Sequence, residues 1–102
     1  MATKLKNLRA GNRTAVTKLL AKFEELKQKS DVELEEVKFI EDGLTQKQKT
    51  LEELNANIME IISEEEVEEE FSNADEYMFN LGYKVQQIRK FVQTIKKTKT
   101  QS

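Results

Sequence analysis

Nine apolar residues follow one another at alternating steps of four and three along the second half of the chain. They are Val67, Phe71, Ala74, Met78, Leu81, Val85, Ile88, Val92 and Ile95. Apolar residues at this spacing form one stripe along an α-helix, which packs against other helices in coiled-coil fashion. The stripe therefore predicts a helix over about residues 64–98.

Two further stripes of this kind lie upstream. One consists of Val37, Ile40, Leu44, Lys47, Leu51, Leu54, Ile58 and Ile61, with Lys47 as its single polar member. The other consists of Leu5, Leu8, Asn12, Val16, Leu19, Phe23 and Leu26, with Asn12 as the exception. They predict helices over about residues 31–62 and 3–29. A chain of 102 residues without proline then forms one helical domain, residues 1–102.

Two serine–glutamate pairs mark the starts of the second and third helices. Ser30 with Glu33, and Ser63 with Glu66, have the spacing of a capping box, in which each side chain bonds an otherwise unpaired backbone amide. The connections at these serines are short, and short connections make neighbouring helices antiparallel. The predicted fold is all-α, an up-down-up antiparallel three-helix bundle with coiled-coil-like packing.

The second helix could also be broken in its middle. Residues 41–43 contain an acidic pair and a glycine, and Thr45 with Gln48 has the spacing of a fresh capping box. The apolar stripe keeps its phase across Gly43, however, which favours one continuous helix.

Charge is segregated along the chain in a way that fits this topology. Residues 1–30 carry eight Lys or Arg and two Glu, while residues 31–62 carry three Lys and nine acids. Residues 63–83 carry eight acids and no base, and residues 84–102 carry six bases and no acid. An up-down-up bundle sets the basic start of the first helix beside the acidic start of the third. It also sets the basic end of the third helix beside the acids at 31–36, and this complementarity disfavours the reversed topology.

The composition argues against catalysis. The chain has no Cys and no His, and its three glycines form no phosphate-binding loop. We expect no enzyme, no metal, no cofactor and no small-molecule substrate. The acidic run Glu64–Glu70 is instead the polar N-terminal part of a helix.

No apolar run is long enough to cross a membrane or to serve as a signal peptide. The lack of cysteine fits a reducing compartment, so we expect a cytoplasmic, intracellular protein.

The two polar members of the stripes are expected to meet. Folding the chain at its two connections sets Asn12 level with Lys47, near residues 79–80, and Gly11, Gly43 and Gly82 lie within about a turn of this level. The layer is either a register-fixing polar contact or a functional hinge. Under both interpretations this middle level of the bundle, which we call the waist (residues 11–13, 43–47 and 80–83), is its least stable part.

Four large apolar residues fall outside the stripes: Phe79, Tyr83, Val32 and Phe39. Phe79 and Tyr83 are four residues apart, which places them side by side on the outward face of the third helix. We expect them to form the centre of a contact with a second copy of the chain, rimmed by Glu68, Asp75 and Glu76. The alternative is that three-helix packing buries some of these four residues.

A family resemblance rests on three segments of the chain. They are LKNLRAGNRTAVTKLLAKFEEL (5–26), LTQKQKTLEELNANIMEII (44–62) and EEEVEEEFSNADEYMFNLGYKV (64–85). They resemble the helical domain of uncharacterised function at the N-terminus of Pao/BEL-type retroelement polyproteins. The most telling parts are RAGNR at 9–13 and EEFSNADEY at 69–77. The resemblance implies a gag-like assembly module, either as part of a polyprotein or as a host protein derived from one.

Two other roles stay open. One is a small helical chaperone or adaptor, similar in architecture to the three-helix tubulin-binding cofactors. The other is nucleic-acid binding through Lys90, Lys96, Lys97 and Lys99, with Lys4 and Lys6. A net charge of −2 argues against nucleic acid as a partner, because its binding depends on a basic surface that neutralises phosphates. We expect these bases to face neighbouring acids and the negative end of their helix instead.

Overall fold

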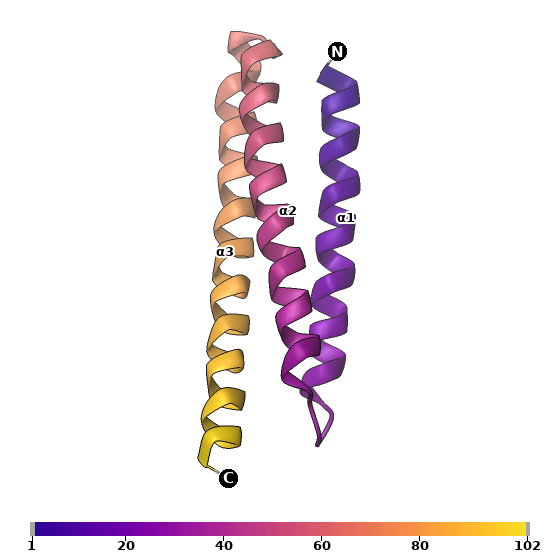
Figure 1. The fold of residues 1–102 in the computed structure, drawn as a ribbon. Helices are drawn as coiled ribbons and strands as arrows, with labels where there is room; N and C mark the ends of the chain where they lie inside the picture. Colours follow the sequence, from indigo (N-terminus) through magenta and orange to yellow (C-terminus); the bar gives the residue numbers. More distant parts are fainter. Residues whose placement is uncertain (1, 102) are drawn as a thin grey trace.

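The computed structural model describes residues 2–101 of the chain, and the side chains of residues 2–97. The three helices are α1 (Ala2–Lys27), α2 (Leu34–Ile61) and α3 (Glu64–Gln101). Each helix runs antiparallel to the one before it, along a body of 57 × 18 × 18 Å (Figure 1). The predicted all-α, antiparallel three-helix bundle is confirmed.

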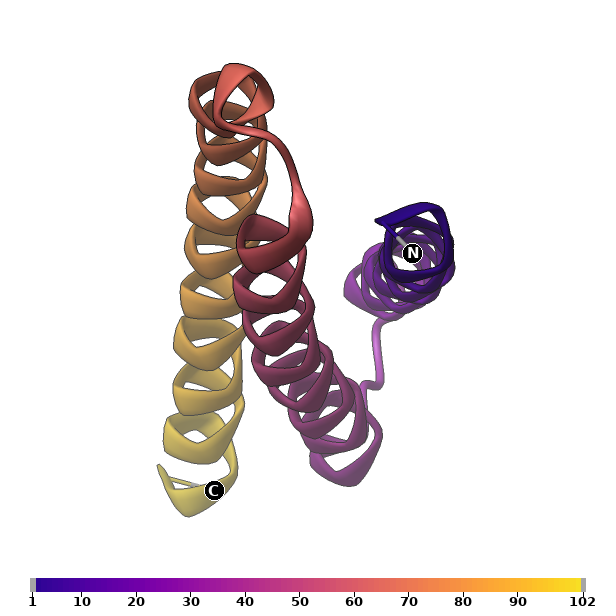
Figure 2. The same cartoon turned by 90° about the horizontal axis from the view of Figure 1, so that it is seen from above.

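α2 is the central helix. α1 packs against α2 and α2 packs against α3, whereas within residues 2–101 no Cα of α1 lies within 8 Å of a Cα of α3. Seen from above, α1 stands apart from α3 with α2 between them (Figure 2). Closely packed helices have axes 8–10 Å apart. α1 and α3 therefore meet only through their side chains.

The core follows the predicted stripes. Leu44, Leu51 and Ile58 of α2 are fully buried, as expected for the helix with a neighbour on two sides. Burying a side chain of this size contributes about 1.5–3 kcal/mol, which offsets the entropy lost on ordering the chain. The buried apolar residues are Val16, Phe23, Leu26, Val37, Ile40, Leu44, Leu51, Ile58, Ala74, Leu81, Val85, Ile88 and Val92.

α2 continues without interruption through Gly43, so the alternative break at residues 41–43 is wrong. A Cβ atom at residue 43 would lie 3.2 Å from Cδ1 of Leu19, which is closer than ordinary van der Waals contact. The glycine thus lets α1 approach α2 closely at this level. That approach accounts for a residue of low helix propensity in the middle of a long helix.

The connection between α1 and α2 is longer than predicted. α2 begins at Leu34, and its N-cap residue Glu33 makes no side-chain hydrogen bond at the cap, so the Ser30–Glu33 capping box is wrong. Val32 and Leu34 pack against the core at this end of the bundle. The backbone of Glu33 is extended, so the helix begins only after it, and Val32 covers the end of the core from the connection.

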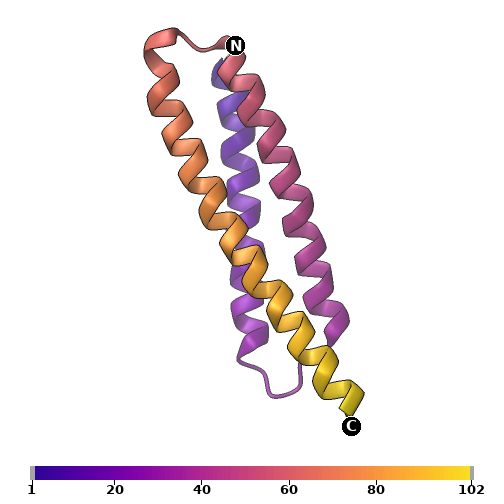
Figure 3. The ribbon, with the colours of Figure 1, turned by 90° about the vertical axis from the view of Figure 1, so that its left-hand side faces the viewer.

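α3 begins at the predicted position. The backbone amide of Glu66 donates a 3.0 Å hydrogen bond to the carbonyl oxygen of Ser63, as expected for the residue that precedes the first helical turn. α3 ends at Gln101, beyond the predicted end at residue 98. Figure 3 shows the two connections at opposite ends of the molecule.

Three stripe residues are exposed where the stripes predicted burial. Leu8 is 49% exposed, Ile61 44% and Phe71 60%. All three lie at the end of the bundle where α1 and α3 begin. Arg9 and Glu70, which are next in sequence to Leu8 and Phe71, are buried at this end in place of their apolar neighbours.

None of the described helices combines the length and the apolar composition that a membrane span requires.

Candidate functional site

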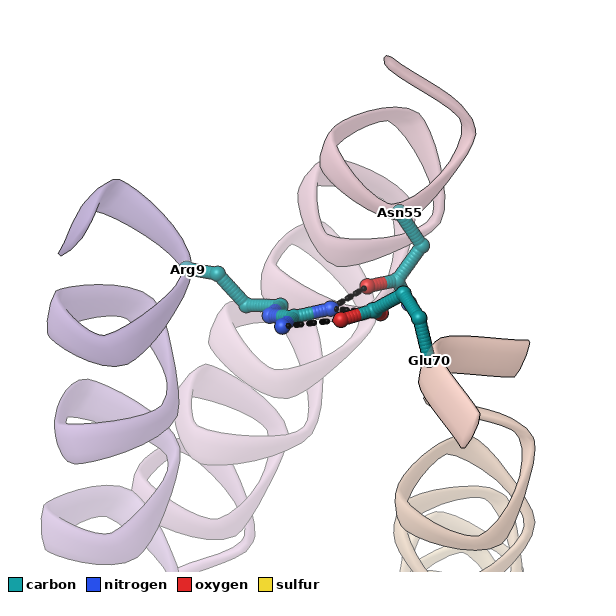
Figure 4. Close-up of polar contacts among 3 residues, drawn as sticks. All are labelled: Arg9, Asn55 and Glu70. Atoms are coloured by element: carbon teal, nitrogen blue, oxygen red, sulfur yellow. Dashed lines mark hydrogen bonds and ion pairs between the residues drawn. The ribbon is translucent and has the colours of Figure 1, made fainter. Parts of the chain in front are cut away.

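Arg9 of α1 reaches across to both other helices (Figure 4). Its Nη2 donates a 2.9 Å hydrogen bond to Oε1 of Glu70, and its Nη1 donates to Oε2 of Glu70 and to Oδ1 of Asn55, the latter at 3.0 Å. The side chains of Arg9 and Glu70 are only 11% and 9% exposed. A two-pronged guanidinium–carboxylate contact is both strong and directional. The cluster therefore ties all three helices together at one end.

The ionisation of Glu70 depends on this contact. The hydrogen bonds from Arg9 hold the pKa of Glu70 below its ordinary value, although burial acts in the opposite direction. The positive charge of Lys6 lowers the pKa of Glu70 further. Glu70 is thus an ionised structural carboxylate at neutral pH, and it lacks the raised pKa of a proton donor.

Arg13 lies one turn further along α1 and stacks on Tyr77 of α3. Its Cζ atom is 4.1 Å from the ring centroid, within cation–π range. Burial lowers the pKa of the Arg13 guanidinium, and the charge of Arg9 acts in the same direction. Burial also raises the pKa of the Tyr77 phenol. Within the described residues Nε and Nη2 of Arg13 have no hydrogen-bond partner, so the ring and the nearby Glu70 carboxylate supply the attraction that offsets the partial burial of this charge.

A third bridge between α1 and α3 is aromatic. The rings of Phe23 and Phe91 meet edge to face, with centroids 5.3 Å apart and planes at 89°. The three bridges explain how two helices whose backbones do not touch stay in register.

Between the bridges, α1 and α3 leave an open groove. One part has a volume of about 370 Å³, and its lining includes Leu20 of α1 and Tyr77, Leu81 and Tyr83 of α3. The adjoining part measures about 240 Å³ and runs along Phe23. The groove is mainly apolar and lacks the convergent polar groups typical of a small-molecule site.

The predicted polar layer is present. Lys47 Nζ donates a 3.2 Å hydrogen bond to Oδ1 of Asn12, and Nδ2 of Asn12 donates to the carbonyl oxygen of Leu8 at 2.9 Å. Both side chains of the layer are half-buried, so the ammonium group can still reach solvent. The contact fits a register-fixing layer between α1 and α2.

The charge complementarity predicted for the two ends is present in part. At the end where α1 and α3 begin, Arg9 pairs with Glu70, and Lys6 lies in a hollow with Glu66 and Glu69. Towards the other end Arg89 Nε pairs with Oε1 of Glu41 at 3.3 Å. This carboxylate lies deeper in α2 than the expected acids at residues 31–36.

The four predicted partner-contact residues do not share one surface. Phe79 is 74% exposed and Tyr83 61% exposed, both on α3. Phe39 of α2 is 77% exposed and lines a separate hollow with Leu26 and Ile40. Val32 is half-buried against the core, which matches the alternative that packing buries some of these residues, and it lies in the connection before α2. Its place in the connection, where it covers the end of the bundle, accounts for this burial.

The basic residues considered for nucleic-acid binding are dispersed. Lys90 and Lys97 are exposed, Lys96 is half-buried, and the side chain of Lys99 lies outside the described part of the chain. Lys4 and Lys6 lie at the opposite end, on α1. In the described residues no group of three or more His, Cys, Asp or Glu could hold a metal ion.

The stripes missed the Arg9–Asn55–Glu70 cluster. A signal for it exists, because Glu70, Tyr77, Lys84 and Phe91 recur every seven residues beside the main stripe of α3. On α1, Arg9 lies seven residues before Val16, a member of the main stripe, and therefore shares its side of the helix. Arg9 on α1 and Glu70 on α3 each begin a row of residues spaced seven apart, and these two rows lie on the faces that α1 and α3 turn towards each other.

Comparison with known proteins found no matching family model, no matching curated protein and no matching solved structure.

Proposed function

We propose that the chain is a non-enzymatic assembly module whose partner is a second copy of itself. The observation that carries the proposal is the exposure of Phe79 and Tyr83, at 74% and 61%, on the outward face of α3. The helix places the two rings side by side on one surface, and each ring has only two side-chain torsions to immobilise when it docks. Aromatic anchors of this kind tend to dominate the binding energy of an interface.

The resemblance of residues 5–26, 44–62 and 64–85 to the gag-like N-terminal domain of Pao/BEL-type polyproteins supports the same role. A domain of that kind would contribute to assembly without carrying out chemistry. The proposal includes an intracellular, cytoplasmic site of action, which a chain without cysteine suits.

Sedimentation velocity over a range of concentrations tests this function. The wild type should show a mass above the 11.9 kDa of one chain, and Phe79→Ser/Tyr83→Ser should return the mass to that of one chain. Helicity measured by circular dichroism should not change, because both rings are exposed. Phe39→Ser is the matched control, since it removes an equally exposed ring from a different surface. A loss of association in the control alone would contradict the proposed contact.

The groove between α1 and α3 favours a second candidate, an adaptor that holds a helix of another protein. Leu20 and Tyr77 would form its apolar floor. A mass of one chain at every concentration would support this candidate over self-association.

A further inference from the structure

The outward face of α3, away from the buried stripe, carries two rows of residues spaced seven apart. Its two rows consist of Glu65, Ser72, Phe79, Gln86 and Gln93, and of Glu69, Glu76, Tyr83, Lys90 and Lys97. Every one of these residues is exposed. Adjacent positions in the two rows are four residues apart, which places their side chains next to each other on the helix surface.

Charge along this surface changes sign at its middle. The residues before Phe79 include three glutamates, and the residues after Tyr83 include Lys90 and Lys97. α3 runs from Glu64 to Gln101, so its midpoint lies between residues 82 and 83. The aromatic pair therefore sits at the centre of the helix, with an acidic half on one side and a basic half on the other.

We infer that two copies of the chain pair through α3 in antiparallel orientation, with the two-fold axis at the level of Leu81. The inference rests on the proposed self-association and specifies its geometry. This register sets Phe79 of each copy level with Tyr83 of the other, because their numbers are symmetric about 81. By the same symmetry Glu65 lies level with Lys97 of the second copy, and Ser72 with Lys90.

The parallel alternative brings like charges together. It would set Glu69 beside Glu69 and Lys90 beside Lys90 along the whole contact, and like charges at facing positions are repulsive. Shifting the antiparallel axis by two residues, to the level of Tyr83, still pairs Glu76 with Lys90. Charge thus selects the orientation, and the aromatic pair selects the register.

The groove beside α3 provides a place for the second copy's ring. Tyr83 forms part of the rim of the 370 Å³ hollow, next to Asn80 and Lys84. In the inferred register the second copy's Phe79 arrives at the level of Tyr83, at the mouth of this hollow. An aromatic ring that enters a pocket is the usual form of a dominant contact.

Single cysteines test the geometry, because the chain contains no cysteine of its own. Ser72→Cys and Lys90→Cys, mixed in equal amounts and oxidised, should form a mixed disulfide dimer. A disulfide needs Cα atoms usually about 4.4–6.8 Å apart, which facing helical positions can reach. Two copies of Ser72→Cys alone would hold their thiols about 27 Å apart at 1.5 Å per residue, and should not cross-link. Gln46→Cys, on an exposed part of α2, gives the rate of random collision.

The inference is supported if the Ser72→Cys and Lys90→Cys mixture cross-links at least about tenfold faster than either variant with Gln46→Cys, as expected for thiols held at high effective concentration. Fast cross-linking of Ser72→Cys with itself would show a parallel pair and overturn the inference. Association of the wild type without the mixed disulfide would overturn the geometry while leaving the proposed function in place. A wild type that stays at the mass of one chain would overturn both.

Charge reversal gives an independent readout that needs no cysteine. Lys90→Glu/Lys97→Glu should weaken self-association by at least about tenfold, because both ends of the contact become acidic. Mixing this variant with Glu65→Lys/Glu69→Lys should restore the mass of two chains. Failure of the mixture to associate, when each variant keeps its helicity, would overturn the charge pairing.

Discussion

Arg9 of α1 and Glu70 of α3 form a nearly buried ion pair between two helices whose backbones do not touch. The pair spans 61 residues of sequence and is completed by Asn55 of the helix that separates them. Because the backbones of α1 and α3 are not in contact, this ion pair fixes the spacing and the register of the two helices.

Replacement of Glu70 by alanine should lower the free energy of unfolding by about 2–4 kcal/mol. It leaves the Arg9 guanidinium buried without its counter-ion, and removal of one partner of a buried pair is strongly destabilising. Glu41→Ala is the matched control, because it breaks the more exposed pair with Arg89 and should cost less than about 1 kcal/mol. Urea unfolding measures both variants, and equal losses would show that burial of the Arg9–Glu70 pair has no special weight.

The pH dependence of stability should also report on Glu70. Because its pKa is lower in the folded protein than in the unfolded chain, its stabilising contribution is complete above the unfolded value of about 4.3. That contribution is lost as pH falls through the lower folded value. Wild-type protein should therefore lose more stability than Glu70→Gln between about pH 5 and pH 2. Parallel stability curves for the two proteins would contradict the assignment.

The polar layer should be replaceable by an apolar one. Asn12→Leu/Lys47→Leu should raise the free energy of unfolding by about 1–2 kcal/mol, because a polar residue in an apolar seam fixes register at a cost in stability. Lys47→Leu alone should give a smaller increase in the free energy of unfolding, since it leaves Oδ1 of Asn12 without its donor. Thermal unfolding provides the measurement. A double variant less stable than either single variant would mean that the layer stabilises the fold directly.

Two of the glycines should respond differently to alanine. Gly11→Ala should stabilise the protein by about 0.5–1 kcal/mol, because a new Cβ there meets nothing within 4 Å and the helix propensity improves. Gly43→Ala should gain less or should destabilise, since the new Cβ would press on Leu19 at 3.2 Å. Equal gains at both positions would mean that α1 moves away from α2 at little cost.

Hydrogen exchange should find the waist of the bundle less protected than the segments on either side. The polar contact between Asn12 and Lys47 and the three nearby glycines all weaken helix or core at this level. Slowest exchange at residues 11–13, 43–47 and 80–83 would be the opposite result, and it would assign the layer a stabilising role.

The fold was predictable because a heptad stripe indicates both where a helix lies and which face of it is buried. Leu44 and Val85 are buried for this reason alone. The inward turn of Glu70 was not predictable in the same way, because it depends on Arg9 of another helix at the same level. The stripe of α3 favoured Phe71, which is 60% exposed. The periodicity of α3 alone does not show that Arg9 lies opposite Glu70; only a comparison of the seven-residue rows of α1 and α3 indicates it.

Val32 shows a second limit. Its place in the sequence allowed a helix from residue 31, but the chain between α1 and α2 uses it to cover the core. The distance between two packed helices determines which residues of their connection cover the core. By contrast, Phe79 and Tyr83 could be placed on the surface from their spacing, because they depend on no partner within the chain.

The central position of α2 also determines how the chain can fold. Each backbone interface joins helices that are neighbours in sequence, so only short loops need to close before the main contacts form. Topologies of this kind fold rapidly, because little loop entropy is lost before the contacts compensate for it. During synthesis the α1–α2 hairpin can form while α3 is still being made. The Arg9–Glu70 ion pair between α1 and α3 can form only after α3 has been made, so it forms late in folding.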